Sequence, residues 1–363
     1  MENSPRGGRL AYLDWARGLA VLLMIEAHTL DAWTRLDVRR TIAFRDATVL
    51  GGFAAPLFLW LAGVGVALAA ARAAERHGVR AAVEAGCRRG LQIFVLGFLF
   101  RAQALLLTPG GALITLFRVD ILNIMGPAMI ATALLWGAAR TTQGRVAALS
   151  AAAAAFAMTT PIVRGSAAVG ALPLWLQWYI RPYGDLTIFT LFPWAAFVFA
   201  GGAAGVLVGA SITTERAERT VHVALATAGA LLIIVGFWTA SRPTIYHASS
   251  FWTSSPAWFA IRLGILMAAF EALYLVSRVV APAARWQAGL ARLGRASLFI
   301  YWIHVELVYG YASWLWRHRL PLWGTAFAFV AFSSLIYAAV VLRDEFVSRR
   351  PRRPRAVTQP ATA

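Results

Sequence analysis

Three polar residues inside one long apolar stretch near the N-terminus have types suited to acid–base chemistry. They are Asp14, Arg17 and His28. At ~100° per helical residue their side chains fall on one face of a helix, whereas Glu26 falls roughly opposite. The face therefore runs from a charged pair to an imidazole ~16 Å further along the helix.

These residues allow more than one interpretation. Asp14 and Arg17 form either an i,i+3 ion pair at the helix entrance or a direct contact to a substrate. His28 is either a hydrogen-bonded core histidine or a catalytic group. We favour the catalytic group, because neutral imidazole is the side chain best suited to general-base work near pH 7.

A second apolar stretch, at 296–316, carries a stripe of mostly polar side chains. Ser297, Tyr301, His304, Val308 and Tyr311 follow a 4-3-4-3 spacing, which places them on one helix face. Such a stripe predicts the wall of a cavity or a polar seam between helices. His304 and Tyr301 are accordingly candidates for positioning a substrate, and a seam histidine is the alternative for His304.

Two further charged residues lie on either side of one interhelical connection. Arg101 is late in the third apolar stretch and Asp120 is early in the fourth. We expect a salt bridge between them near the outer face, and both remain candidates for substrate positioning. Glu271 and Arg262 lie inside another apolar stretch, and no partner for either is visible in the sequence.

The elements that must position these residues are membrane spans. Of the 363 residues, 60% are hydrophobic and 14% charged, and the mean hydropathy is +0.64. This composition indicates an all-α, polytopic integral membrane helix bundle. A span needs roughly 20 mostly apolar residues, and about ten stretches qualify: 12–34, 48–71, 89–107, 119–139, 146–163, 187–210, 221–240, 258–279, 296–316 and 322–342.

Charge predicts the orientation of these spans. The net charge of +18 comes from arginine alone, since the sequence contains no lysine. The side that holds both termini carries 21 loop and tail arginines, against ten on the other side, so both termini should be cytoplasmic. Because most arginines lie in short loops between apolar stretches, they indicate the orientation of the spans in the membrane. We therefore expect no nucleic-acid partner. Residues 1–342 form one membrane domain, and 343–363 form a basic disordered tail against the lipid headgroups.

Several common catalytic motifs are absent from the sequence. It contains no Walker loop, no dinucleotide-binding glycine fingerprint, no His-Glu-x-x-His and no Gly-x-Ser-x-Gly. The sequence therefore gives no motif evidence for a nucleotide-driven enzyme, a zinc enzyme or a serine hydrolase. We expect no metal.

The residues from Arg9 to His28 resemble a family motif. Their pattern, Arg-x-x-x-Leu-Asp-x-x-Arg-Gly-x-Ala-x-x-x-Met-x-x-x-His, is similar to the opening helix of the transmembrane acyltransferase superfamily. The subfamily that the chain resembles is the heparan-alpha-glucosaminide N-acetyltransferase catalytic domain with its bacterial relatives. Further stretches agree with this resemblance, at 56–65, 88–90, 120–126 and 294–304.

The resemblance implies a membrane-embedded acyltransferase. Such an enzyme moves an acyl group, here an acetyl group, from cytosolic acyl-CoA to a hydroxyl or amine of a glycan or other envelope acceptor across the membrane. By resemblance, Arg17 holds the CoA, Asp14 orients Arg17, and His28 takes the acceptor's proton or carries the acyl group. A bacterial member lies in the inner membrane, with the lipid bilayer as partner, and a homo-oligomer is compatible with the sequence.

One departure from the family pattern bears on these roles. The lysosomal member has asparagine at the position of His28 and its proposed catalytic histidine further on, whereas no histidine lies between His28 and His77 here. Either His28 takes the catalytic role, as in the broader superfamily, or the chemistry differs. The alternative to an enzyme is a transporter or lipid-linked flippase, because buried charges also build substrate paths. A non-catalytic scaffold is the third possibility.

Overall fold

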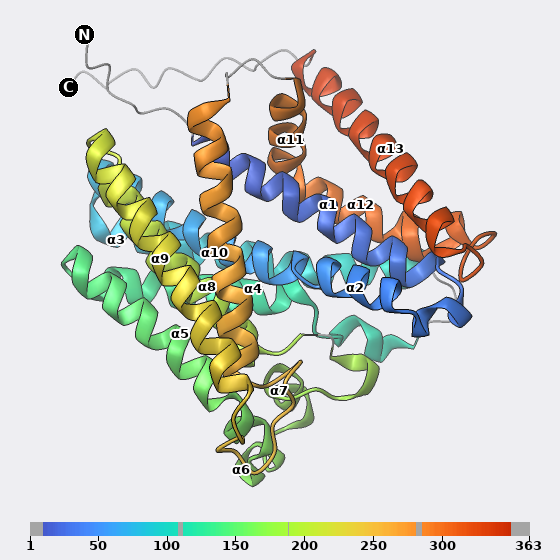
Figure 1. Ribbon diagram of the computed structural model, residues 1–363, viewed down its shortest axis with the longest axis horizontal. Coiled ribbons are helices and arrows are strands. Elements are labelled where there is room, and N and C mark those ends of the chain that lie inside the picture. Colours follow the sequence, from blue (N-terminus) through green and yellow to red (C-terminus); the bar gives the residue numbers. More distant parts are fainter. Residues whose placement is uncertain (1–9, 108–111, 188, 281–284, 350–363) are drawn as a thin grey trace, which may run out of the picture.

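Helices make up every regular element of the residues that the structure describes. The computed structural model describes residues 10–107, 112–187, 189–280 and 285–349. Within them it contains no strand and only two isolated β-bridges (Figure 1). The all-α prediction is confirmed. The α-helices are α1 Ala11–Trp33, α2 Ile42–Gly51, α3 Ala54–Leu107, α4 Ile121–Ala138, α5 Thr142–Gly165, α6 Ala167–Gly170, α7 Leu174–Ile180, α8 Leu191–Ser211, α9 Glu215–Ala240, α10 Pro256–Val279, α11 Arg285–Arg295, α12 Ser297–Tyr309 and α13 Leu322–Ser348.

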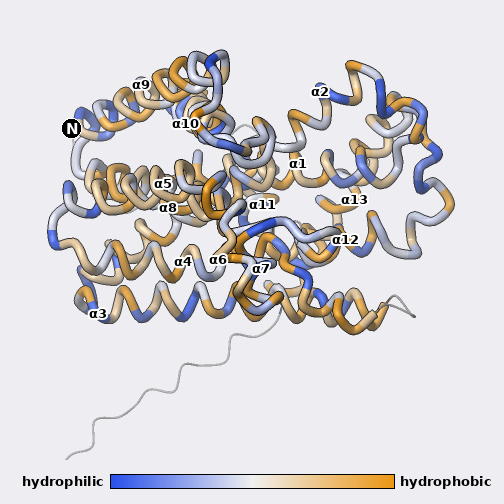
Figure 2. Tube along the Cα trace, turned by 90° about the horizontal axis from the view of Figure 1, so that it is seen from below, coloured by the Kyte–Doolittle hydropathy of each residue, from blue (hydrophilic) through white to orange (hydrophobic). Residues whose placement is uncertain are grey.

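The described helices include seven segments long and apolar enough to cross a membrane. Figure 2 shows hydrophobic residues along most of these helices. The chain is therefore a polytopic helical membrane protein. The count of about ten spans stays a prediction, because α1 carries several charges and α12 has only 13 residues, fewer than the roughly 20 that a span needs.

The helix α3 contains a sharp reversal. At Gly78 the backbone takes φ 82° and ψ 165°, values that favour glycine and interrupt the helix. A straight helix of 54 residues would be about 80 Å long. Phe58 and Phe100, on opposite sides of Gly78, instead line the same cavity. The second arm of α3 thus corresponds to the stretch predicted at 89–107, whereas the stretch predicted at 48–71 begins in α2 and continues in the first arm of α3 after a break at 52–53.

Two predicted boundaries near the C-terminus differ from the structure. The stretch predicted at 296–316 ends as a helix at Tyr309, because Gly310 is extended and a 3-10 turn follows. The last helix, α13, continues to Ser348, so the first six residues assigned to the disordered tail are helical. The remainder of that tail, from residue 350, lies outside the described residues.

The two ends of α1 are held against the C-terminal helices. A Cβ at Gly18 would overlap the carbonyl oxygen of Leu290, and a Cβ at Gly294 would overlap that of Asp14, so glycine permits α1 and α11 to pack closely. At the other end, the indole of Trp33 donates a hydrogen bond to the carbonyl oxygen of Val308 at 3.1 Å. These contacts place α12 directly beside α1.

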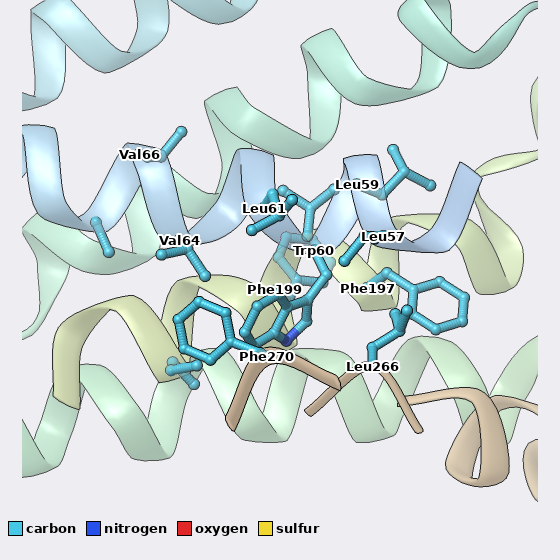
Figure 3. Packing of buried hydrophobic residues seen from close by; sticks show 14 of the residues in the cluster. Leu57, Leu59, Trp60, Leu61, Val64, Val66, Phe197, Phe199, Leu266 and Phe270 are labelled. Atoms are coloured by element: carbon cyan, nitrogen blue, oxygen red, sulfur yellow. The ribbon is translucent and has the colours of Figure 1, made fainter. Parts of the chain in front are cut away.

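The largest part of the core packs between α3, α8 and α10 (Figure 3). The ring of Trp60 meets that of Phe270 edge to face, with centroids 4.9 Å apart. A Cβ at Gly63 would overlap the carbonyl of Val198, so α3 and α8 approach closely at this glycine. This tight packing fixes the first arm of α3, which forms one wall of the cavity.

Candidate functional site

A cavity of about 1260 Å³ lies between α1, both arms of α3, α4, α10 and α12. Arg17 and His28 both line it, whereas Glu26 does not. The helix-face prediction for α1 agrees with this placement. One continuous space therefore contacts both the guanidinium near the N-terminal end of α1 and the imidazole ~16 Å further along the same helix.

Asp14 and Arg17 form the i,i+3 ion pair that was one of their two interpretations. An Oδ1–Nη1 distance of 3.2 Å joins them, and the Asp14 side chain is almost fully buried. The Arg17 side chain retains 31% of its exposure and also lines a second space of about 360 Å³ together with Arg72. The ion pair thus holds Arg17 where two cavities meet.

His28 and His304 are hydrogen-bonded to each other. His28 Nδ1 lies 2.9 Å from His304 Nε2, and their ring planes are nearly parallel, at 12°. His304 Nδ1 in turn lies 2.9 Å from the carbonyl oxygen of Ile300 and 3.0 Å from that of Tyr301. A carbonyl oxygen only accepts hydrogen bonds, so His304 Nδ1 carries a proton and donates it.

This arrangement determines the tautomer of the neutral pair. Because His304 Nδ1 is protonated, His304 Nε2 offers a lone pair, and His28 Nδ1 must donate to it. His28 Nε2, on the opposite side of a ring that lines the cavity, then has a lone pair available. An imidazole held in this tautomer is arranged to accept a proton.

The residues of the polar stripe expected on α12 do not all line the cavity. Ser297 and Tyr301 line the cavity as expected, but His304 is fully buried and does not. Tyr311 lies beyond the end of α12 and is 66% exposed. The cavity face of α12 instead continues through Val305 and Tyr309. The physical reason is the close approach of α1, which covers the side of α12 that carries His304.

Arg101 and Asp120 form the predicted salt bridge. The Nη2–Oδ2 distance is 2.6 Å, and both side chains are largely buried. Asp120 also caps α4, where its Oδ1 accepts a hydrogen bond from the backbone of Ile121 at 2.6 Å. Arg101, Asp120 and Tyr301 all line the cavity. The pair therefore belongs to the same site as His28. Its charged groups already bond to each other, and Asp120 also bonds to the start of α4.

Several cavity residues were not identified from the sequence. Arg118, Glu306, Tyr309 and Arg317 all line the space, and the Tyr309 ring contacts that of His28 with centroids 5.5 Å apart. Arg118 and Arg317 lie in connecting segments, where arginine is expected for topological reasons. One feature of the sequence could have identified Arg118 as a cavity residue, namely its position two residues before Asp120.

Glu271 has a partner on another helix. Its Oε2 lies 2.7 Å from Nδ1 of His222 in α9, and His222 Nε2 lies 3.3 Å from the hydroxyl of Tyr12 in α1. None of these three residues lines the main cavity. They connect α1, α9 and α10 as a buried polar cluster, and we assign them a structural role.

Comparison with known proteins agrees with the resemblance in the opening helix. Residues 9–241 match the family model described as heparan-alpha-glucosaminide N-acetyltransferase, catalytic. No curated protein matches the chain. The matched part contains Arg17, His28, Arg101 and Asp120 and covers more than half of the sequence, whereas His304 lies beyond it. The chain therefore belongs to the heparan-alpha-glucosaminide N-acetyltransferase catalytic domain family, a family of membrane acetyltransferases.

Proposed function

We propose that this protein transfers an acetyl group from acetyl-CoA to a hydroxyl or amine of a glycan or other envelope acceptor. One observation carries the proposal. A single cavity joins Arg17, which suits a phosphate, to His28, whose Nε2 lone pair suits proton abstraction. Donor and acceptor can then bind side by side in one cavity, and the acetyl group can pass directly from one to the other.

The residues around Arg17 suit the anionic part of CoA. Arg17 and Arg89 line the main cavity and Arg72 lines the adjoining one. Guanidinium groups bind phosphate oxygens with charge-assisted hydrogen bonds, and the ion pair with Asp14 orients Arg17. The ~16 Å between Arg17 and His28 suits an extended pantetheine arm that places the thioester beside the imidazole.

His28 is the proposed base. Its Nε2 takes the proton from the acceptor's hydroxyl or amine as that atom attacks the thioester carbonyl carbon. A new ester or amide bond forms, and the carbon–sulfur bond breaks. His28 then returns the proton to the departing thiolate, which leaves as free CoA with its thiol restored. His304 Nε2 keeps His28 Nδ1 protonated throughout, so the accepting nitrogen is always Nε2, on the side of the ring away from His304.

The sidedness of the reaction follows from the arginine distribution. With both termini cytoplasmic, the Arg17 end of the cavity faces the cytosolic supply of acyl-CoA and the His28 end lies toward the far side. For a bacterial cell we accordingly propose the inner membrane as the location of the protein and the envelope as the location of its acceptor.

The alternative function is transport of a substrate or a lipid-linked glycan. Helices broken near the membrane midplane would favour it. Within the described residues, the non-helical positions inside helices are Gly78, between two predicted spans, and Phe192, at the start of α8. Neither interrupts the middle of a span, but α12 ends at Tyr309 inside the stretch predicted at 296–316, so the preference for transfer rests on the cavity that joins Arg17 to His28.

The proposal is tested with the purified full chain in lipid nanodiscs. Radiolabelled acetyl-CoA and an envelope extract are supplied, and we expect label in the glycan fraction and release of free CoA thiol. A folded protein that transfers no label from any acyl donor, while it moves a glycan across a vesicle membrane, contradicts acyl transfer and favours the transporter.

The donor end has its own prediction. We expect Arg17→Gln to raise the KM for acetyl-CoA by about tenfold, since a charge-assisted hydrogen bond to phosphate is lost, and to change kcat little. Arg80→Gln is the matched control, because Arg80 is exposed, pairs with Glu84 and does not line either cavity. Initial rates at varied acetyl-CoA check the effect. An unchanged KM removes Arg17 from the donor site.

A further inference from the structure

The main cavity is about as long as a bilayer is thick. The second arm of α3 lines it from Ala82 to Ala104, a rise of about 33 Å, compared with ~30 Å for the hydrocarbon core. Lining residues toward both ends are exposed, Ala85 and Arg89 at one end and Asp31 at the other. A cavity of this length is a route for water and ions across the membrane unless part of its wall opposes them.

The walls of the cavity run in directions that the close contacts of two glycines define. A Cβ at Gly65 would lie 3.5 Å from Arg17 Nη2, and one at Gly51, just before the first arm of α3, would meet the side chain of Ala27. The first arm of α3 is therefore antiparallel to α1. After the reversal at Gly78 the second arm runs parallel to α1.

The charged groups of these walls lie at two levels. Arg17 and Arg89 line the donor end. His28 lies ~16 Å further along α1, and Arg101 lies ~18 Å further along the parallel second arm of α3. Arg101 is held there by Asp120 at 2.6 Å. Two polar levels are thus separated by a middle section of the cavity.

The wall of this middle section is apolar. Each of four helical segments contributes a large side chain to the lining: α1 contributes Met24, the first arm of α3 contributes Phe58, the second arm contributes Ile93, and α4 contributes Met125. At 1.5 Å per residue, Met24 and Phe58 both lie ~10 Å from the level of Arg17. We call these four residues the apolar collar.

Two further observations support the collar as a barrier. Met24 and Ile93 are only 4% and 5% exposed, so they pack firmly into the wall. On the fifth wall, α12 adds the ring of Tyr301, whose centroid lies 5.4 Å from that of the Phe100 ring. Aliphatic and aromatic side chains therefore surround the cavity between its two polar levels.

An apolar section opposes ions even where it is wide enough to admit them. An ion that enters it loses hydration without gaining a partner of opposite charge, and water wets a narrow apolar wall poorly. Methionine side chains are flexible, so Met24 and Met125 can move aside for a slender ligand and close again behind it. A cavity built in this way admits a substrate and still resists ions.

We propose that the apolar collar seals the cavity against protons and other ions, so that both sides of the membrane share one site without a leak. This proposal goes beyond acyl transfer and does not depend on it, because a ligand cavity of this length needs a barrier whatever reaction it serves. The collar contains no group that is charged or that titrates, which separates its role from those of Arg17 and His28.

Proton leak through the protein tests the collar directly. Purified full-length protein is reconstituted into liposomes that contain potassium and a pH-sensitive dye, and valinomycin sets an inside-negative potential. Protons enter only where a path exists. The rate of internal acidification is compared for the wild type, for the double variant Met24→Gln with Met125→Gln, and for the double variant with leucine at the same two positions.

The glutamine variant should acidify at least about tenfold faster than the wild type, which corresponds to a barrier lower by about 1.4 kcal/mol. Glutamine is similar in size to methionine but attracts water into the collar. The wild type and the leucine variant should acidify no faster than liposomes without protein, because leucine keeps the collar apolar.

Met158→Gln is the matched control for the glutamine variant. Met158 is 47% exposed and lies outside the cavity lining, so this variant should stay as tight as the wild type. Size-exclusion chromatography shows whether each variant folds. Met125→Gln alone replaces the double variant if that does not fold, since the Met125 side chain is only partly buried.

Each outcome supports or overturns the collar. A wild type that leaks as fast as the glutamine variant overturns it, as does a folded glutamine variant that stays tight. An equal leak in the leucine variant or in Met158→Gln also overturns it, since apolar character or position would then not matter. Label transfer is measured on the same preparations. A wild type that is tight but transfers no label, together with a leaking glutamine variant, rejects acyl transfer alone, whereas transfer by the wild type together with a tight glutamine variant rejects the collar alone.

Discussion

Replacement of His28 by alanine is expected to reduce acetyl transfer by about 10²- to 10⁴-fold, the range that a positioned general base contributes. The loss should appear in kcat, because the imidazole acts on the acceptor's proton and does not hold the CoA. Alanine also leaves room for water without supplying a basic nitrogen. Initial rates with labelled acetyl-CoA, at saturating donor and acceptor, measure the effect.

His77→Ala is the matched control for this substitution. His77 is exposed and lies outside the cavity lining, so its loss should leave transfer unchanged. Size-exclusion chromatography of both variants shows whether they fold. Transfer that survives His28→Ala at the wild-type rate rejects the assignment of His28 as base and leaves the acyltransferase function standing.

The same preparation distinguishes a base from an acyl carrier. If His28 carries the acetyl group, incubation with labelled acetyl-CoA without acceptor leaves label on the wild-type protein and none on His28→Ala. We expect no protein-bound label in either, because one cavity contacts both proposed binding ends and permits direct transfer.

Replacement of His304 by leucine is expected to lower kcat by about 10²-fold, below the ~10⁴-fold loss that follows when the group holding a catalytic imidazole's tautomer is altered in a serine-protease triad. His304 does not line the cavity, so it acts through His28. Leucine removes the acceptor for His28 Nδ1–H and frees the ring to turn or change tautomer. The KM for acetyl-CoA should stay the same.

Rescue by glutamine separates positioning from simple packing. The side-chain oxygen of His304→Gln can accept the hydrogen bond from His28 Nδ1, so this variant should recover much of the lost kcat, whereas His304→Leu should not. Thermal unfolding of both variants provides the structural comparison. If the glutamine and leucine variants lose the same activity in proportion to their stability, His304 only supports the packing of α12.

The regular spacing of residues along a helix was sufficient to predict part of this site. The Asp14–Arg17 ion pair is an i,i+3 contact, and Arg17 and His28 share a face that a helical period of 3.6 residues defines. The Arg101–Asp120 bridge joins residues only 19 positions apart. Local geometry limits where such side chains can lie, so their placement could be predicted.

Contacts between distant helices could not be predicted in this way. The bond between His28 and His304 joins residues 276 positions apart, and that between His222 and Glu271 joins residues of two separate helices. Periodicity places His304 on a face of α12 but does not state which neighbour covers that face. The close approach of α1 decided that His304 lies behind His28 and does not line the cavity.

The sequence by itself determined that this chain lies in a lipid bilayer and that its spans are helical. It also determined that Arg17 and His28 lie on one face of α1. Each follows from the free energy of exposing polar groups to hydrocarbon and from the helical repeat. Only the tertiary structure decided which imidazole nitrogen is free, where α12 ends and which arginines share a cavity with His28. These features depend on the packing of helices far apart in sequence, where glycines such as Gly18 and Gly294 set the distances between helices.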